Sequence, residues 1–230
     1  MRVGFFGGSF DPPHRGHIAL ARLAQERLGL DRLLFAPVGA QPLKHEGTPS
    51  TPFEDRVAMV RLAIADEPGM EVSLADAPRA DGRPNYTIDT IRLVRDSLKA
   101  GDSLFCLMGA DSFLTIGKWH QSEDLLLGCD FVVASRPGFD LQKIAAALPG
   151  SISLAAEHSD LPGCLVIGLR DGRRGAAGEH SRLYLLPDLA EDISATEIRS
   201  ELRARTHAEI PAPVADYIAA HRLYREEPAG

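Results

Sequence analysis

The sequence of 230 residues has only three cysteines, one tryptophan, no excess of positive charge and no long apolar run. The cysteines are isolated and show neither metal-ligand spacing nor a disulfide framework, so we expect small buried side chains. A formal net charge of −7 disfavours a nucleic-acid-binding surface. No apolar run approaches the ~20 residues that span a bilayer, and no secretory pattern begins the chain. We therefore expect a cytoplasmic protein with no nucleic-acid and no membrane partner.

Apolar runs rich in β-branched and aromatic residues alternate with helical patterns over the first two-thirds of the chain. This alternation predicts an α/β fold with a doubly wound parallel sheet. Ligands of such sheets bind beyond the carboxyl ends of the strands. The predicted strands are 2–6, 32–38, 71–74, 103–108 and 130–135, and the predicted helices are 15–28, 53–66, 87–100 and 112–127, the last broken near Gly117.

The stretch from about 138 to 182 interrupts this alternation with glycines, prolines and short apolar pieces. We interpret it as a peripheral insertion, in which 164–169 forms a hairpin with 182–186. Two helices, 194–205 and 212–221, then form a small C-terminal helical part at about 194–222. We expect one domain over residues 1–230.

The most informative segment is GGSFDPPHRGH at residues 7–17, between the first strand and the first helix. Glycines let a ligand approach the backbone, prolines stiffen the loop, and a helix N-terminus attracts anions. His14 and His17 stand three residues apart, so both imidazoles fall on one side of the helix start. Phosphates nearby would raise the pKa of both histidines. Because the turn lacks a Gly-x-Gly-x-x-Gly spacing and a Walker lysine, it indicates neither a Rossmann dehydrogenase nor a P-loop.

A second candidate site is ISATEIR at residues 193–199. Ser194 and Glu197 match a capping box, which explains these two residues without any ligand. Thr196 and Arg199 lie three apart near the helix N-terminus and therefore share a face. A hydroxyl, backbone N–H groups and a guanidinium at a positive helix end suit a terminal polyphosphate. Taken alone, the motif is equally consistent with a structural and a binding role.

The two motifs together resemble the signatures of the nucleotidyltransferase superfamily with paired HxGH-type and ISSTxxR-type elements. The GGSFDPPH form is most similar to that of the bacterial nicotinate-nucleotide adenylyltransferases. The resemblance extends from residue 2 to about residue 225 and is weakest across the insertion. Further matching stretches are 37–44, NYTIDT at 85–90, GAD at 109–111, WH at 119–120 and SRPG at 135–138.

The resemblance implies a role for each matching residue. His14, His17 and Arg199 would be catalytic, because they would stabilise charge on the phosphates of ATP. The implied ATP site comprises Gly8, Ser9, Phe10, His14, His17, Arg136, Ser194, Thr196 and Arg199. The implied mononucleotide site comprises Lys44, Thr87, Asp111, Trp119 and His120, with no protein-bound metal.

Some residues leave alternatives open or depart from the family pattern. Trp119, in a polar setting, suits a core anchor and a stacking partner for a pyridine ring equally well. Tyr86 is expected to pack rather than to bind. Leu43, Asn85 and Ala195 stand where the family commonly has histidine, serine and serine.

The activity that the resemblance implies is direct adenylyl transfer. The phosphate of nicotinate mononucleotide would attack the α-phosphorus of ATP, giving nicotinate adenine dinucleotide and pyrophosphate in NAD biosynthesis. Mg²⁺ held by the phosphates, with few protein ligands, would supply part of the positive charge. Nicotinamide mononucleotide and pantetheine phosphate remain alternative substrates, and a non-catalytic nucleotide-binding protein of the same fold is a further alternative. A homo-oligomer is left open.

Overall fold

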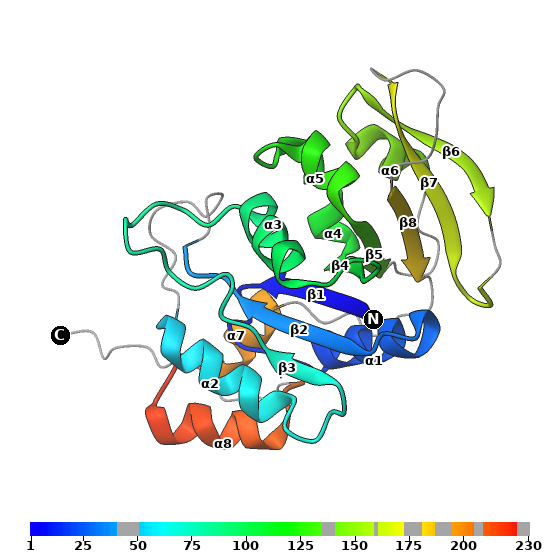
Figure 1. Ribbon diagram of the computed structural model, residues 1–230. Coiled ribbons are helices and arrows are strands. Elements are labelled where there is room, and N and C mark those ends of the chain that lie inside the picture. The colour runs from blue at the N-terminus through cyan, green and yellow to red at the C-terminus, as the bar shows by residue number, and fades with distance from the viewer. Residues whose placement is uncertain are drawn as a thin grey trace.

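The computed structural model forms an α/β fold around a single eight-stranded sheet in the residues that it describes (Figure 1). These residues are 1–40, 51–134, 141–158, 161–172, 181–186, 195–204 and 209–224. The order of the strands in the sheet is β3-β2-β1-β4-β5-β8-β7-β6. Their bounds are β1 Arg2–Gly8, β2 Arg32–Pro37, β3 Met70–Val72, β4 Ser103–Gly109, β5 Asp130–Ala134, β6 Ile152–His158, β7 Leu165–Asp171 and β8 Ser181–Leu186.

The sheet is parallel from β3 to β8 and becomes antiparallel only where β7 and β6 are added at its far edge. The predicted parallel sheet is thus confirmed for its main part. Because β1 pairs with β2 on one side and with β4 on the other, the strand order reverses at β1. Ligands of open α/β sheets bind at such a switch point.

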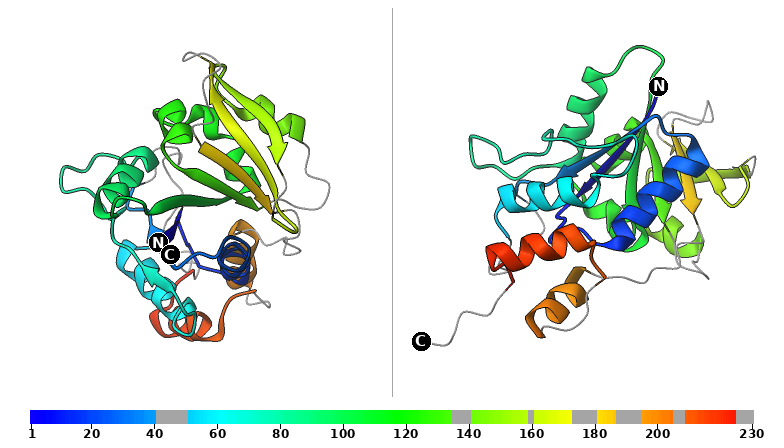
Figure 2. Two further views of the ribbon diagram at one scale, coloured as in Figure 1. Left: turned by 45° about the vertical axis from the view of Figure 1, so that its right-hand side comes forward. Right: turned by 90° about the horizontal axis from the view of Figure 1, so that it is seen from below.

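Helices cover both faces of the sheet, as the two views of Figure 2 show. Their buried side chains form two clusters. One cluster contains side chains of α1, α2, α7 and α8, and the other contains side chains of α3, α4, α5 and α6. Side chains of β1 alternate between the clusters, with Phe5 in one and Phe6 in the other, as expected for a strand buried on both faces. The helices are α1 Arg15–Leu28, α2 Phe53–Ala63, α3 Thr87–Ser97, α4 Ala110–Phe113, α5 Ser122–Gly128, α6 Leu141–Ala147, α7 Ala195–Ala204 and α8 Ala212–His221, with a 3₁₀ turn at Ile116–Lys118.

The predicted helix over 112–127 consists of three short pieces in the structure, α4, the 3₁₀ turn and α5. Packing explains the break at Gly117, where a Cβ atom would lie 2.7 Å from the carbonyl oxygen of Ala147. Gln121, with φ of 50°, then redirects the chain into α5. Two other helices are shorter than predicted, since α2 ends at Ala63 and α3 at Ser97.

The stretch that we interpreted as a peripheral insertion contains α6, β6 and β7. The predicted hairpin is confirmed, since β7 pairs antiparallel with β8. α6 and β6 were not predicted from the sequence. β7 and β6 extend the main sheet rather than forming a separate loop region. β6 changes register against β7 between Leu154 and Glu157, which obscures a simple alternation of side chains.

The C-terminal helices lie on the face of the sheet that carries α1 and α2 (Figure 1). α8 packs along α2, and its Val214 and Ile218 are buried. The predicted bounds of α8 are confirmed, and α7 lies inside its predicted range. No helix in the described ranges is both long and apolar enough to cross a membrane.

Candidate active site

The carboxyl ends of β1, β2 and β4 meet at one edge of the sheet. Gly8 at the end of β1 is in register with Pro37, and the Val38 N–H donates to the Gly8 carbonyl at 2.9 Å. On the other side, Phe6 is in register with Leu107 of β4. The loop GGSFDPPHRGH leaves β1 at this edge and enters α1, so the predicted strand, loop and helix are confirmed. The motif therefore lies at the switch point of the sheet.

The side chain of Phe10 anchors this loop in the core. It is 1% exposed and contacts Phe6, Phe35 and the His17 ring at centroid distances of 5.4, 5.5 and 4.9 Å. Its φ of 45° lies in the left-handed region, which is unfavourable for a residue with a Cβ atom. Burial of the ring offsets this strain. The contribution of Phe10 to a nucleotide site would therefore come from its backbone.

The two histidines of the motif lie against each other. Their ring centroids are 3.6 Å apart with an interplanar angle of 29°. The backbone N–H of His14, the N-cap residue of α1, donates to Nδ1 of His17 at 3.1 Å. This bond fixes the neutral His17 tautomer with its proton on Nε2. No described group forms a hydrogen bond with the buried Nδ1 of His14.

Both imidazoles are neutral at neutral pH in the protein without ligand. Burial lowers the pKa of His14 to about 4. Burial, and secondarily repulsion by His14, lowers the pKa of His17 well below its usual value. The raised pKa values expected beside phosphates apply to the ligand-bound protein and stay a prediction.

Asp11, between Phe10 and the two prolines, connects this loop to the C-terminal part of the chain. Its backbone carbonyl accepts a hydrogen bond from Nη1 of Arg199 at 2.9 Å. Its carboxylate, 1% exposed, accepts bonds from the Tyr224 hydroxyl at 2.6 Å and from the Thr51 N–H at 3.4 Å. Arg199 of the second motif and the histidine motif are therefore neighbours, although 188 positions separate Arg199 from Asp11.

Arg56, a buried residue of α2, holds the same loop through hydrogen bonds of its guanidinium. Its guanidinium donates to the carbonyl of Ser9 at 2.8 Å and to that of Thr51 at 3.0 Å. Burial lowers the pKa of Arg56, and the nearby Asp11 carboxylate opposes this shift. Neither Arg56 nor Tyr224 was predicted from the sequence. An arginine within an apolar helix face was the available signal for Arg56, whereas Tyr224 had none.

The N-terminus of α1 is less available to an anion than the sequence suggested. The backbone N–H of Arg15 donates to the carbonyl of Glu209 at 3.0 Å, and the two side chains approach to 3.6 Å. The segment that precedes α8 thus covers one of the first N–H groups of α1. Binding of phosphate here depends on the remaining groups of the turn and on the histidines.

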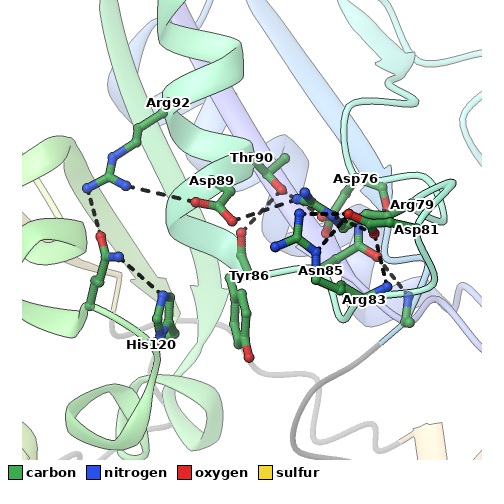
Figure 3. A network of polar contacts seen from close by, with 12 residues as sticks. Asp76, Arg79, Asp81, Arg83, Asn85, Tyr86, Asp89, Thr90, Arg92 and His120 are labelled. Carbon is green, nitrogen blue, oxygen red and sulfur yellow. Dashed lines mark hydrogen bonds and ion pairs between the residues drawn. The ribbon is translucent and has the colours of Figure 1, made fainter.

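At the other end of the candidate site, Asn85 fixes the start of α3 (Figure 3). Its Oδ1 accepts the Ala40 N–H at 3.1 Å, while Nδ2 donates to the carbonyls of Asp76 and Ala77 at 3.2 and 2.9 Å. A serine could not make all three bonds. Asparagine at this position therefore holds the chain after β2 beside α3, and Thr87 follows as the first residue of α3.

Tyr86 joins α3 to the segment that contains Trp119 and His120. The rings of Tyr86 and His120 lie 4.2 Å apart and are tilted by 32°, so Tyr86 packs as expected (Figure 3). The Trp119 indole is half-buried against the cluster on the α3 face, and its Nε1 donates to Oγ1 of Thr115 at 3.0 Å. The observed contacts of Trp119 are those of a core anchor, and the residue is only partly buried.

The structure describes only some of the remaining candidate residues. Asp111 is exposed in the first turn of α4, directly after β4. Thr196 belongs to α7, but its side chain lies outside the described residues. Lys44, Arg136 and Ser194 lie outside the described residues altogether. Within the described ranges, no group of three His, Cys, Asp or Glu side chains could hold a metal ion.

Comparison with known proteins agrees with this geometry. The model of the cytidylyltransferase-like family matches residues 5–201. The chain is 34% identical to a probable nicotinate-nucleotide adenylyltransferase of Geobacter metallireducens, covering 99% of this chain and 100% of the relative. It is 37% identical to one of Pseudomonas entomophila, with coverages of 97% and 95%.

A solved structure of similar fold is the nicotinic acid mononucleotide adenylyltransferase of Plasmodium falciparum complexed with NaAD. It has a TM-score of 0.66 and 19% identity, and the alignment covers 97% of each chain. At this identity the likeness concerns the fold alone. The full-length match to the bacterial relatives, together with the histidine motif at the switch point, shows that the chain belongs to the nicotinate-nucleotide adenylyltransferases of the cytidylyltransferase-like family.

Proposed function

We propose that the protein transfers the adenylyl group of ATP to nicotinate mononucleotide, forming nicotinate adenine dinucleotide and pyrophosphate. The observation that carries this proposal is the contact between the two sequence motifs at Asp11. The stacked His14 and His17 stand at the start of α1, and Arg199 of α7 reaches the carbonyl of Asp11, three residues before His14. A triphosphate bound between the histidines and α7 would meet nitrogen donors from both motifs.

The chemistry needs no nucleophilic side chain, because the phosphate of the mononucleotide is itself the attacking group. Its oxygen forms the new bond to the α-phosphorus of ATP while the bond to the β-phosphate oxygen breaks, and pyrophosphate leaves. The protein contributes position and charge stabilisation. In its fixed tautomer, His17 can donate Nε2–H to a phosphoryl oxygen without first gaining a proton.

The donor set at this end fits a magnesium ion that is held by phosphates and water rather than by the protein. The groups His14, His17 and Arg199 are nitrogen donors, which suit phosphate oxygens better than Mg²⁺ itself. Bound Mg²⁺ would neutralise part of the negative charge of the triphosphate. We place the reaction in the cytoplasm, as the sequence predicts.

The mononucleotide would bind at the start of α3 and at the segment 119–120. A helix N-terminus offers N–H groups to a carboxylate, and Thr87 adds a hydroxyl there. The exposed part of the Trp119 ring offers an aromatic face for the pyridine ring. Lys44, Asp111 and His120 complete the proposed mononucleotide site, and Arg136, Ser194 and Thr196 complete the ATP site.

Pyrophosphate release tests this proposal. We expect release from ATP and Mg²⁺ only when a mononucleotide is added, with a higher kcat/KM for nicotinate than for nicotinamide mononucleotide. The selectivity should be about tenfold or more, since each donor to a carboxylate contributes roughly 1–3 kcal/mol. Equal rates for both mononucleotides, or a preference for the amide, would overturn the proposed substrate. Absence of release from folded protein would favour a non-catalytic nucleotide-binding role.

A further inference from the structure

Three contacts attach the C-terminal part of the chain to residues 11–15, within the histidine motif at residues 7–17. Arg199 of α7 donates to the carbonyl of Asp11, and the carbonyl of Glu209, ahead of α8, accepts the N–H of Arg15. The Tyr224 hydroxyl, beyond α8, donates to the Asp11 carboxylate at 2.6 Å. The proposed mechanism uses Arg199 but gives no role to Tyr224.

The chain after α8 adopts an uncommon backbone to bring Tyr224 to Asp11. Arg222 and Tyr224 both have φ in the left-handed region, at 56° and 60°. Non-glycine residues adopt this conformation at a cost in free energy, which other contacts must offset. The Tyr224 ring packs against the cluster on the α1 and α2 face, and its hydroxyl forms the bond to Asp11. Burial and the Asp11 carboxylate both raise the pKa of Tyr224, so the hydroxyl remains a hydrogen-bond donor.

A displacement of Asp11 would also move His14 and Arg199, which we propose to bind the phosphates. Two prolines separate it from His14, and because each proline has a fixed φ, a displacement of Asp11 is passed on to His14. The carbonyl of Asp11 also holds the guanidinium of Arg199. The carboxylate is almost fully buried, so loss of a donor leaves it poorly solvated and favours its reorientation.

We propose that Tyr224 is a positioning residue, whose hydroxyl fixes the Asp11 carboxylate and thereby holds His14 and Arg199 in the arrangement that binds the phosphates of ATP. This inference rests on the proposed adenylyl transfer. Tyr224 itself touches neither substrate nor reacting atoms in this scheme. Its effect should therefore appear in kcat as well as in the free energy of unfolding.

The chain contains a matched control for this experiment. Tyr217 of α8 also donates its hydroxyl to a carboxylate, that of Asp55 in α2, at 2.8 Å. That bond attaches the same C-terminal region to the same face but does not involve the histidine loop. Tyr224→Phe and Tyr217→Phe each remove one tyrosine hydroxyl that donates to a carboxylate. A difference in kcat between the two variants is therefore attributed to the displacement of Asp11.

We expect Tyr224→Phe to lower kcat by about tenfold or more, since small misplacements of catalytic groups have effects of this size. The KM for nicotinate mononucleotide should match that of Tyr217→Phe, whose kcat should equal that of the unchanged protein. The melting temperature of Tyr224→Phe should be lower by a few degrees, because the buried Asp11 carboxylate loses a donor. Equal kcat values in the two variants would overturn the inference.

A readout without turnover separates this inference from the proposed function. The ring-proton NMR signals of His14 should shift in Tyr224→Phe and not in Tyr217→Phe, whether or not the protein is an adenylyltransferase. If the unchanged protein releases no pyrophosphate, the proposed function is wrong, and the histidine signals still test the positioning of the loop. If it does release pyrophosphate and the His14 signals of Tyr224→Phe are unchanged, the positioning role is wrong.

Discussion

At the end of the candidate site that we propose to bind phosphates (the phosphate end), Asp11 and His14 are almost completely buried. Hydrogen bonds from α2 to Ser9, and from α7 and the chain after α8 to Asp11, hold the loop that carries them. At the end that we propose to bind the nicotinate ring (the ring end), Asp111 and His120 are exposed, and Trp119 and Thr87 are half-buried. The hydrogen bonds of Asn85 fix the backbone at Ala40 and Ala77 and do not involve the side chains proposed to contact the ring. The phosphate end is thus arranged before ligand arrives, which suits a charge-rich transition state. The ring end is more open, which suits initial binding and selection.

The largest expected effect comes from removing the His17 imidazole at the phosphate end. His17→Ala should lower kcat by about 10²-fold, because a donor to the developing charge is lost. His17→Asn keeps an acceptor near the position of Nδ1, which binds the His14 N–H, but lacks the Nε2–H donor. We therefore expect the asparagine variant to recover stability without recovering kcat.

Steady-state kinetics and thermal unfolding of both variants check this prediction. A folded His17→Ala variant with near-normal kcat would show that the imidazole does not act on the phosphates. Recovery of kcat in His17→Asn would reduce His17 to a group that holds the backbone of His14.

A smaller effect is expected at the ring end. Trp119→Ala should raise the KM for the mononucleotide by about fivefold, because one stacking contact worth about 1 kcal/mol is lost, and should leave the KM for ATP unchanged. Tyr86→Phe is the control, since it keeps the ring that contacts His120 and removes only a hydroxyl. Equal increases in both KM values would mean that Trp119 serves only as the core anchor indicated by its bond to Thr115.

The same contrast explains what the sequence could and could not predict. The α/β alternation and α1 depend on local periodicity, and the bounds of α1 were predicted without error. His14 and His17 are separated by one helical turn, so their proximity also follows from the sequence. The bond between Asp11 and Tyr224 joins positions 213 apart, and no local pattern marks such a pair. β6 was missed because an irregular register interrupts its alternation.

The smallest expected effect concerns pH and the carboxyl group of Asp76, which lies beside Asn85 and Thr90 (Figure 3). Asp76 is buried and accepts the Thr90 hydroxyl at 2.6 Å. Burial raises the pKa of Asp76 from 3.8 to about 6, against the opposing hydrogen bonds from Thr90 and Asn85. The folded protein therefore binds this proton more tightly than the unfolded chain does. Its contribution to stability is complete below the unfolded pKa and is lost as pH rises through about 6.

Between about pH 5 and about pH 7, Asp76 should lower the free energy of unfolding by about 1 kcal/mol, and Asp76→Asn should remove this change. His14 acts in the opposite direction over part of the same range, because burial lowers its pKa and its contribution is lost as pH falls. The two ends of the site thus have opposite pH dependences, and the difference between Asp76→Asn and the unchanged protein isolates Asp76.

Asp81→Asn is the control, since hydrogen bonds from Arg83 lower the pKa of exposed Asp81 to about 2 and keep it ionised at both pH values. Urea unfolding at the two pH values measures the difference, and an Asp76→Asn variant with the pH dependence of the unchanged protein would contradict the assigned protonation of Asp76.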